Sequence, residues 1–200
     1  MSEVSATQVR ELREKTGAGM LDCKKALSES SGDMDRAVVY LRERGLAAAA
    51  KKASRAAAEG LIGSYIHTTG KIGVLLEVNC ETDFVARTPD FQALVKDVSM
   101  QVAAANPRFV RREEVPDSVV ESEREIYRAQ MVDSGKPANV VDKIITGKLE
   151  KFFAETCLME QAFIREPERT VGQMVNDAIA RLGENVVVRR FARFQVGEQL

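Results

Sequence analysis

The stretch that decides the fold is Ile72-Gly73-Val74-Leu75-Leu76-Glu77-Val78-Asn79-Cys80-Glu81-Thr82-Asp83-Phe84-Val85. Apolar residues recur at every second position from Ile72 to Cys80, which predicts a β-strand with one buried face. Residues 61–66 predict a second strand, and the turn His67-Thr68-Thr69-Gly70 joins the two into a hairpin. The alternation ends at Cys80, so the three polar residues that follow mark the point where the chain leaves the sheet.

A third strand and several helices complete the predicted core. Residues 185–196 predict a strand with its apolar residues on one face, namely Val186, Val188, Ala192, Phe194 and Val196. A helix opened by Thr88, with Pro89 at its first position, follows the hairpin, and another is expected over residues 170–182. The predicted fold class is α+β, with about three antiparallel strands covered by helices over residues 60–200.

Residues 117–153 predict a helical hairpin within this core. The segment 117–135 is rich in charge, whereas the segment that begins at Pro137 carries apolar residues at helical spacing. The turn Ser134-Gly135-Lys136-Pro137 is expected to join the two helices.

Residues 1–45 predict a small three-helix bundle. Ser5-Ala6-Thr7-Gln8 has the spacing of a capping box, and Thr16-Gly17-Ala18-Gly19 interrupts the helix that it opens. A third helix is expected to stop at Gly45. The alanine-rich residues 46–59 then predict a helical connector, because alanine favours helix but buries little surface.

Composition excludes several function classes. Among 200 residues, 29 Lys and Arg balance 30 Asp and Glu, so direct nucleic-acid binding, which favours a basic excess, is not expected. No apolar run approaches the roughly 20 residues that span a bilayer. The start Met1-Ser2-Glu3-Val4 is polar, unlike a signal peptide, so a cytoplasmic location is expected. The three cysteines are odd in number and far apart, which disfavours a disulfide framework or a zinc site.

Reactive groups are sparse, so no enzyme activity and no cofactor are expected. The one histidine, His67, sits in a turn and is interpreted as a hydrogen-bonding turn residue, with a general base as the alternative. No phosphate-binding P-loop, dinucleotide fingerprint or zinc-protease motif occurs. Thr16-Gly17-Ala18-Gly19 precedes a helix, as phosphate-binding loops do, but no strand precedes it, which favours a plain turn.

Phe84 has two interpretations. Its ring can fold back into the core while Thr82 or Asp83 caps a turn, and the pattern alone favours this arrangement. The alternative is an exposed aromatic anchor beside an acid, a combination that carries binding energy at protein interfaces.

Two long motifs resemble the elongation factor Ts family. They are Thr16-Gly17-Ala18-Gly19-Met20-Leu21-Asp22-Cys23-Lys24-Lys25-Ala26-Leu27 and Glu77-Val78-Asn79-Cys80-Glu81-Thr82-Asp83-Phe84-Val85. Shorter matches at Ser134-Gly135-Lys136-Pro137, Cys157-Leu158-Met159-Glu160-Gln161 and Thr170-Val171-Gly172 extend the resemblance over essentially the whole chain. The resemblance implies a guanine-nucleotide exchange factor that promotes GDP release from elongation factor Tu.

The resemblance also implies which residues contact elongation factor Tu. The N-terminal bundle resembles a ubiquitin-associated domain, and the positions that would dock on the GTPase are Arg13, Met20, Leu21 and Lys24. For Met20 the alternative is core packing. Thr82-Asp83-Phe84-Val85 matches the wedge that enters near the magnesium and phosphate site, which favours the exposed interpretation of Phe84. The His67 turn and the turn Gly183-Glu184-Asn185 resemble loops that contact the far domains of that partner.

The resemblance leaves the assembly state and three rival functions to be tested. Longer members carry two related halves of the core, whereas this chain shows one hairpin and one terminal strand. The exposed sheet edge that results favours a homodimer in which two sheets combine, and hence a 2:2 complex with elongation factor Tu. The rival functions are a non-catalytic adaptor that binds through its N-terminal bundle, an enzyme that uses His67 or Cys80, and an RNA-binding translation protein.

Overall fold

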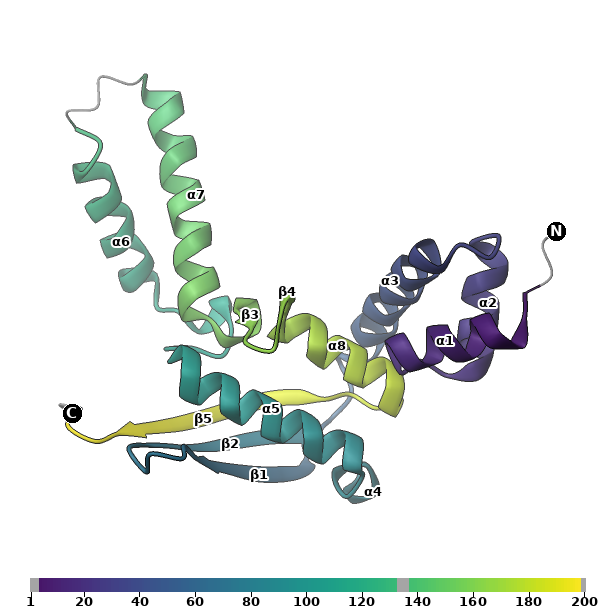
Figure 1. The fold of residues 1–200 in the computed structure, drawn as a ribbon. Helices are drawn as coiled ribbons and strands as arrows, with labels where there is room; N and C mark the ends of the chain where they lie inside the picture. The colour runs from purple at the N-terminus through teal and green to yellow at the C-terminus, as the bar shows by residue number, and fades with distance from the viewer. Residues whose placement is uncertain (1–3, 133–136, 199–200) are drawn as a thin grey trace. The chain divides into compact units, whose positions relative to one another are not determined.

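The computed structural model describes residues 4–132 and 137–198. By their contacts these residues form two units, so that each unit is assembled from separate parts of the chain. The first contains the chain up to Leu61, then Val78–Val95 and Met174–Val187. The second contains Ile62–Glu77, Lys96–Gln173 and the chain from Val188 onward. The α+β class is confirmed: N-terminal helices precede a three-stranded antiparallel sheet with its helices (Figure 1).

Three helices form the N-terminal bundle: α1 (Ala6–Thr16), α2 (Met20–Glu29) and α3 (Met34–Lys52). The predicted capping box is present, because the Ser5 hydroxyl accepts from the Gln8 backbone N–H at 3.2 Å and the Gln8 side chain accepts from the Ser5 N–H. Gly17, at φ +67°, ends α1 in the left-handed conformation that favours glycine. The bundle has its own core, made of Val9, Leu12, Cys23, Ala26, Leu27 and Ala37.

The predicted stop of the third helix at Gly45 is wrong, because α3 continues to Lys52. Gly45 is buried, and a Cβ at this position would lie 3.6 Å from the Cβ of Ala180. The glycine therefore serves close packing rather than a chain break, and the alanines that follow favour helix. The division into a bundle over 1–45, a connector over 46–59 and a core over 60–200 stays a prediction.

The predicted hairpin is formed by β1 (Glu59–Ile66) and β2 (Ile72–Cys80). The His67 N–H donates to the Ile72 carbonyl at 2.9 Å, and Gly70 takes a positive φ in the turn. The alternation in β2 is confirmed, since Val74, Leu76, Val78 and Cys80 are buried while Leu75 is half exposed. Helix α5 (Pro89–Ala105) lies along the sheet (Figure 1) and begins at the predicted cap, where the Thr88 hydroxyl accepts from the Phe91 N–H at 3.3 Å.

Strand β5 (Val187–Gln195) pairs with β2 and completes the sheet in the order β1-β2-β5. The prediction that its apolar residues share one face is wrong. Val186 and Val188 are buried, whereas Phe194 and Val196 are largely exposed. Arg193 donates to the Ala103 carbonyl of α5, so it faces the side of the sheet that α5 covers. The buried Val188 faces the same side, although the two residues are an odd number of positions apart. The alternation therefore shifts by one residue within the strand, and Phe194 turns to the opposite face.

The predicted helical hairpin consists of α6 (Asp117–Ala129) and α7 (Ala138–Thr156), and the two helices contact one another. Most of the predicted turn, residues 134–136, lies outside the described residues. Near the base of α7, the Arg112 guanidinium binds the carboxylates of Glu150 and Glu160 at 2.9 and 2.6 Å. It also lies 4.6 Å from the centre of the Phe153 ring. These bonds to Arg112 lower the pKa of Glu150.

A second, two-stranded sheet was not predicted. It pairs β3 (Ala162–Phe163) with β4 (Glu166–Thr170) ahead of α8 (Val171–Leu182). Gln101, which is fully buried, accepts from the Ile164 N–H at 2.9 Å and donates to the Gln161 side chain at 3.1 Å. These bonds join α5 to the β3 segment. The strands are too short for their sequence to show a period of two.

Candidate functional site

The segment that follows β2 forms a four-residue helix, α4 (Asp83–Ala86). Thr82 caps it, because its hydroxyl accepts from the Val85 N–H at 3.4 Å. The Cys80 thiol donates to the Thr82 carbonyl at 3.1 Å, so the last residue of the strand holds the first residue of the turn. The predicted cap at Thr82 is therefore present, but the ring that was expected to fold inward with it does not do so.

Phe84 points its ring into solvent. It is 78% exposed, which excludes the interpretation that it packs into the core of its own chain. Its neighbour Asp83 binds the Arg87 guanidinium at 2.7 Å, and both side chains are partly exposed. Val85 is half-buried and Ala86 is buried, so these two residues face the protein, whereas Phe84 and Asp83 face outward.

A second exposed group lies on α2. Met20 is 58% exposed and Leu21 is 84% exposed, and Lys24 follows one turn later on the surface. The opposite face of α2, with Cys23, Ala26 and Leu27, supplies the bundle core. Core packing of Met20 is thereby excluded. Two adjacent exposed apolar side chains with a cation one turn away suit a protein contact.

Arg13 lines a polar hollow of about 430 Å³ in the first unit, shared with Arg10, Glu14, Gly17, Asp90 and Arg181. Asp90 stands in the first turn of α5, a few residues after α4, and its carboxylate lies 3.7 Å from the Arg181 guanidinium. The Arg181 side chain also lies against Gly17, where an added Cβ would meet its Nη1 at 3.1 Å. The hollow thus brings Arg13 of the bundle to the start of α5.

His67 is exposed in the hairpin turn, and its Nδ1 lies 3.2 Å from the Tyr65 hydroxyl. It belongs to the second unit, whereas the other predicted site residues belong to the first. The role of His67 as a partner contact stays a prediction. The polar side chains of the other predicted contact turn are engaged within the chain, since Asn185 is buried and Glu184 binds the residues ahead of α4. Sequence reasoning missed this inward role of Glu184, because Glu184 and Thr82 are 102 positions apart and leave no local signal.

The cysteine thiols are poorly placed for chemistry. All three are buried, and burial raises the pKa of each thiol. Among the residues placed in the structure, no cluster of three or more His, Cys, Asp or Glu side chains could hold a metal ion. Within the same described ranges, no helix is long and apolar enough to cross a bilayer.

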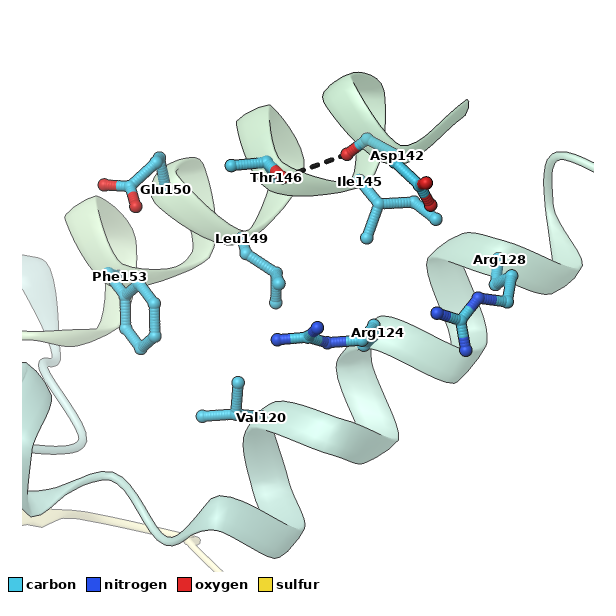
Figure 2. A pocket seen from close by; sticks show the side chains of 9 residues that line it. All are labelled: Val120, Arg124, Arg128, Asp142, Ile145, Thr146, Leu149, Glu150 and Phe153. Carbon is cyan, nitrogen blue, oxygen red and sulfur yellow. Dashed lines mark hydrogen bonds between the residues drawn. The ribbon is translucent and has the colours of Figure 1, made fainter. Parts of the chain in front are cut away.

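A larger hollow, of about 520 Å³, opens between α6 and α7. Figure 2 shows Arg124 and Arg128 reaching into it from α6, opposite Ile145 and Leu149 of α7. The Thr146 hydroxyl on its rim donates to the Asp142 backbone carbonyl at 2.9 Å, and so is used within the helix. The described lining holds neither histidine nor cysteine, and its mixture of arginines, carboxylates and apolar groups offers no nucleophile with an adjacent base.

The chain is similar to elongation factor Ts proteins over nearly its whole length. The family model described as elongation factor TS matches residues 34–198. Elongation factor Ts of Heliobacterium modesticaldum is 62% identical over 197 residues, which cover 98% of this chain and 92% of that protein. The proteins of the same name from Thermoanaerobacter sp. and Geobacter sulfurreducens are each 61% identical and are covered over 96% and 91% of their lengths. The chain therefore belongs to the elongation factor Ts family.

Proposed function

We propose that the chain loosens GDP from elongation factor Tu by inserting Phe84, flanked by Thr82, Asp83 and Val85, beside the magnesium and phosphate site of that GTPase. As a member of its family, the chain is a nucleotide exchange factor for elongation factor Tu in translation elongation, a cytoplasmic process, and is not an enzyme. The alternative of an adaptor without exchange activity is set aside.

The proposal rests on the exposure of Phe84. This residue stands on the short helix α4, and the segment ahead of α4 is hydrogen-bonded to the rest of the chain. A phenylalanine that is 78% exposed has apolar surface to bury in a partner. Full burial of such a side chain contributes roughly 1.5–3 kcal/mol. This is about a tenfold to hundredfold change in an equilibrium constant, since each factor of ten corresponds to about 1.4 kcal/mol.

Exchange needs no bond chemistry by the factor. GDP is held by backbone amides and a magnesium ion, so a small displacement of these groups removes several charge-assisted contacts. Asp83 and Arg87, which bind one another at 2.7 Å, bring a charged pair to the same place. Coupling between two ligands of one protein is reciprocal, so GDP must weaken the factor as much as the factor weakens GDP.

The exposed face of α2 supports a second contact. Met20 and Leu21 supply apolar area and Lys24 supplies charge, while Arg13 of α1 is proposed to add a second cation to the contact. Binding through the bundle anchors the factor without displacing nucleotide, so it leaves the contact energy of Phe84 available for the displacement. Variants of α2 are therefore expected to raise the factor concentration needed for half-maximal exchange.

The test is stopped-flow release of labelled GDP from elongation factor Tu. Phe84→Ala is expected to slow release about tenfold or more at a saturating concentration of the factor, while the thermal unfolding curve stays unchanged because the ring is exposed. Ile164→Ala, which truncates an exposed apolar side chain of the second unit, should leave the rate unaltered. A native rate for Phe84→Ala would show that the ring is not the wedge.

We also propose that two copies of the chain associate through the open face of the sheet and form a 2:2 complex. On this face Arg190 of β5 binds Glu77 of β2 at 2.7 Å, and a Cβ on Gly73 would meet the Ile66 side chain. Counting in steps of two from Ile66 in β1, from Glu77 in β2 and from Arg190 in β5 places four exposed apolar residues here, Ile62, Ile66, Leu75 and Phe194, and the exposed Val196 directly follows β5. An apolar sheet face of this kind is suited to packing against a second sheet.

Sedimentation tests the dimer. The native chain is expected to sediment as a dimer at micromolar concentration, and Leu75→Lys, which places a charge at the centre of the face, is expected to sediment as a monomer. Lys143→Leu, on the distant α7, serves as the charge-changing control and should remain dimeric. A native chain that is monomeric under these conditions refutes the proposal.

A further inference from the structure

We propose that Glu184, in the turn after α8, is a positioning residue for the exchange reaction. Its carboxylate holds the backbone ahead of α4 and thereby aims Phe84. The inference rests on the proposed role of Phe84 and adds the residue on which that role depends. Glu184 itself need not touch the partner.

The carboxylate of Glu184 accepts three hydrogen bonds from two consecutive residues. One oxygen accepts from the backbone N–H groups of Glu81 and Thr82, at 3.1 and 3.0 Å. The other oxygen accepts from the Thr82 hydroxyl at 2.7 Å. These are charge-assisted bonds, which are shorter and stronger than bonds between neutral groups.

The Thr82 hydroxyl connects the Glu184 carboxylate to α4. A hydroxyl has one proton to donate and two lone pairs that accept. Because its proton is directed to Glu184, the lone pairs are free to accept from the Val85 N–H, the bond that caps the helix. The orientation of the cap is thus decided by a carboxylate 102 residues further along the chain.

Glu184 is itself held in place by a reciprocal set of bonds. The Glu81 carboxylate accepts from the Asn185 N–H at 2.6 Å and lies 3.5 Å from the Arg55 guanidinium. Asn185 is 3% exposed, and its side-chain amide donates to the Arg55 carbonyl at 2.8 Å. Each turn therefore donates backbone N–H groups to the glutamate of the other, so neither can shift alone.

α4 needs such external support because it is short. A helix of four residues lies far below the roughly 12–15 residues at which an isolated helix becomes marginally stable in water. The Phe84 ring has few contacts of its own, since it is 78% exposed. Without Glu184 the segment would sample other conformations, and its ordering on binding would reduce the energy left for displacing nucleotide.

The test is GDP release from elongation factor Tu with Glu184→Ala, Glu184→Gln, Phe84→Ala and the double variant Glu184→Ala/Phe84→Ala. Glu184→Ala removes all three bonds and is expected to slow release about tenfold or more, since one charge-assisted hydrogen bond alone corresponds to about a factor of ten. Glu184→Gln keeps an oxygen for the backbone donors and should recover part of the rate. Glu168→Ala, at an exposed position of β4, is the matched control and should exchange at the native rate.

The double variant separates positioning from general stability. If Glu184 acts through Phe84, then Glu184→Ala has little further effect once Phe84 is alanine, whereas independent effects multiply. Hydrogen exchange of the free factor gives a second readout, because the Glu81 and Thr82 amides should lose protection in Glu184→Ala while the amides inside α5 and α8 stay protected.

Three outcomes overturn the inference. Multiplying effects in the double variant, or a native rate for Glu184→Ala beside a slowed Phe84→Ala, would refute the positioning role and leave the wedge intact. A native rate for Phe84→Ala would refute the wedge and, with it, the role assigned to Glu184. Non-additive slowing with partial recovery by glutamine supports the inference.

Discussion

Gly60→Ala is expected to disrupt the hairpin that carries the site. Gly60 lies in β1 at φ +143°, a backbone conformation that residues with a side chain rarely adopt. An added Cβ would lie 2.1 Å from the Val78 carbonyl oxygen and 2.7 Å from the Cα of Asn79, far inside ordinary contact. Both neighbours are backbone atoms of β2, so no side chain can turn away to relieve the clash, and the strands must separate locally.

The cost can be built from its parts. A residue held in a disfavoured backbone region costs about 1–3 kcal/mol. Separating the strands loses one or two ladder hydrogen bonds at about 1 kcal/mol each. The free energy of unfolding should therefore fall by about 2–5 kcal/mol, and the thermal midpoint by about 10 °C for a chain of this size.

Calorimetry and urea unfolding measure the effect, and two other glycines serve as controls. Gly70 has φ +67° and no atom within 4 Å of an added Cβ, so Gly70→Ala isolates the backbone contribution, about 1–2 kcal/mol. Gly147, inside α7, has neither constraint, and Gly147→Ala should stabilise by up to about 1 kcal/mol. If Gly60→Ala costs no more than Gly70→Ala, the strands do not approach as closely as described.

Three further predictions concern stability. Gln101→Leu leaves the Ile164 N–H without its side-chain acceptor and should lower the free energy of unfolding by about 1–3 kcal/mol in urea titrations; an unchanged midpoint would show that water replaces the bond. Ser5→Ala removes the cap of α1 and should cost about 1 kcal/mol, read from helical circular dichroism during unfolding, with Ser28→Ala, at an exposed position of α2, as a control that should not show this loss. Burial holds the pKa of the three thiols above the pKa of a thiol in the unfolded chain, which is about 8.5. Above that pH the unfolded chain binds fewer protons than the folded chain. The contribution of the buried thiols to the free energy of unfolding should therefore be fully present below about pH 8 and be lost as the pH rises above it. Calorimetry at increasing pH measures this loss, and a Cys80→Ala variant with an undiminished slope would contradict it.

Much of the fold could be predicted because its signals are local. The period of two in β2 predicts which residues are buried, and Thr88 with Pro89 predicts the start of α5. The errors arose where packing overrides a local rule. Gly45 resembles a helix end, but close contact with Ala180 makes it an interior residue of α3. The shift of alternation in β5 leaves no mark in the sequence, because apolar residues occupy both faces of that strand.

For the candidate site, the motif alone indicated the segment but not the direction of its ring. Apolar pattern favoured a buried Phe84, and only the resemblance to a family favoured exposure. The exposure of 78% decided between these interpretations. The same holds for Met20: its helical spacing was compatible with a core position, but its side chain is exposed.

The sequence by itself determined the α+β class, the buried face of β2, the capped starts of its helices and the family, since each depends on residues close together in the chain. Only the tertiary structure decided that Phe84 points outward and that Glu184 holds the turn behind it. The physical reason is distance along the chain: a hydrogen bond between residues 102 apart depends on how the intervening helices fold, and no local pattern encodes that path.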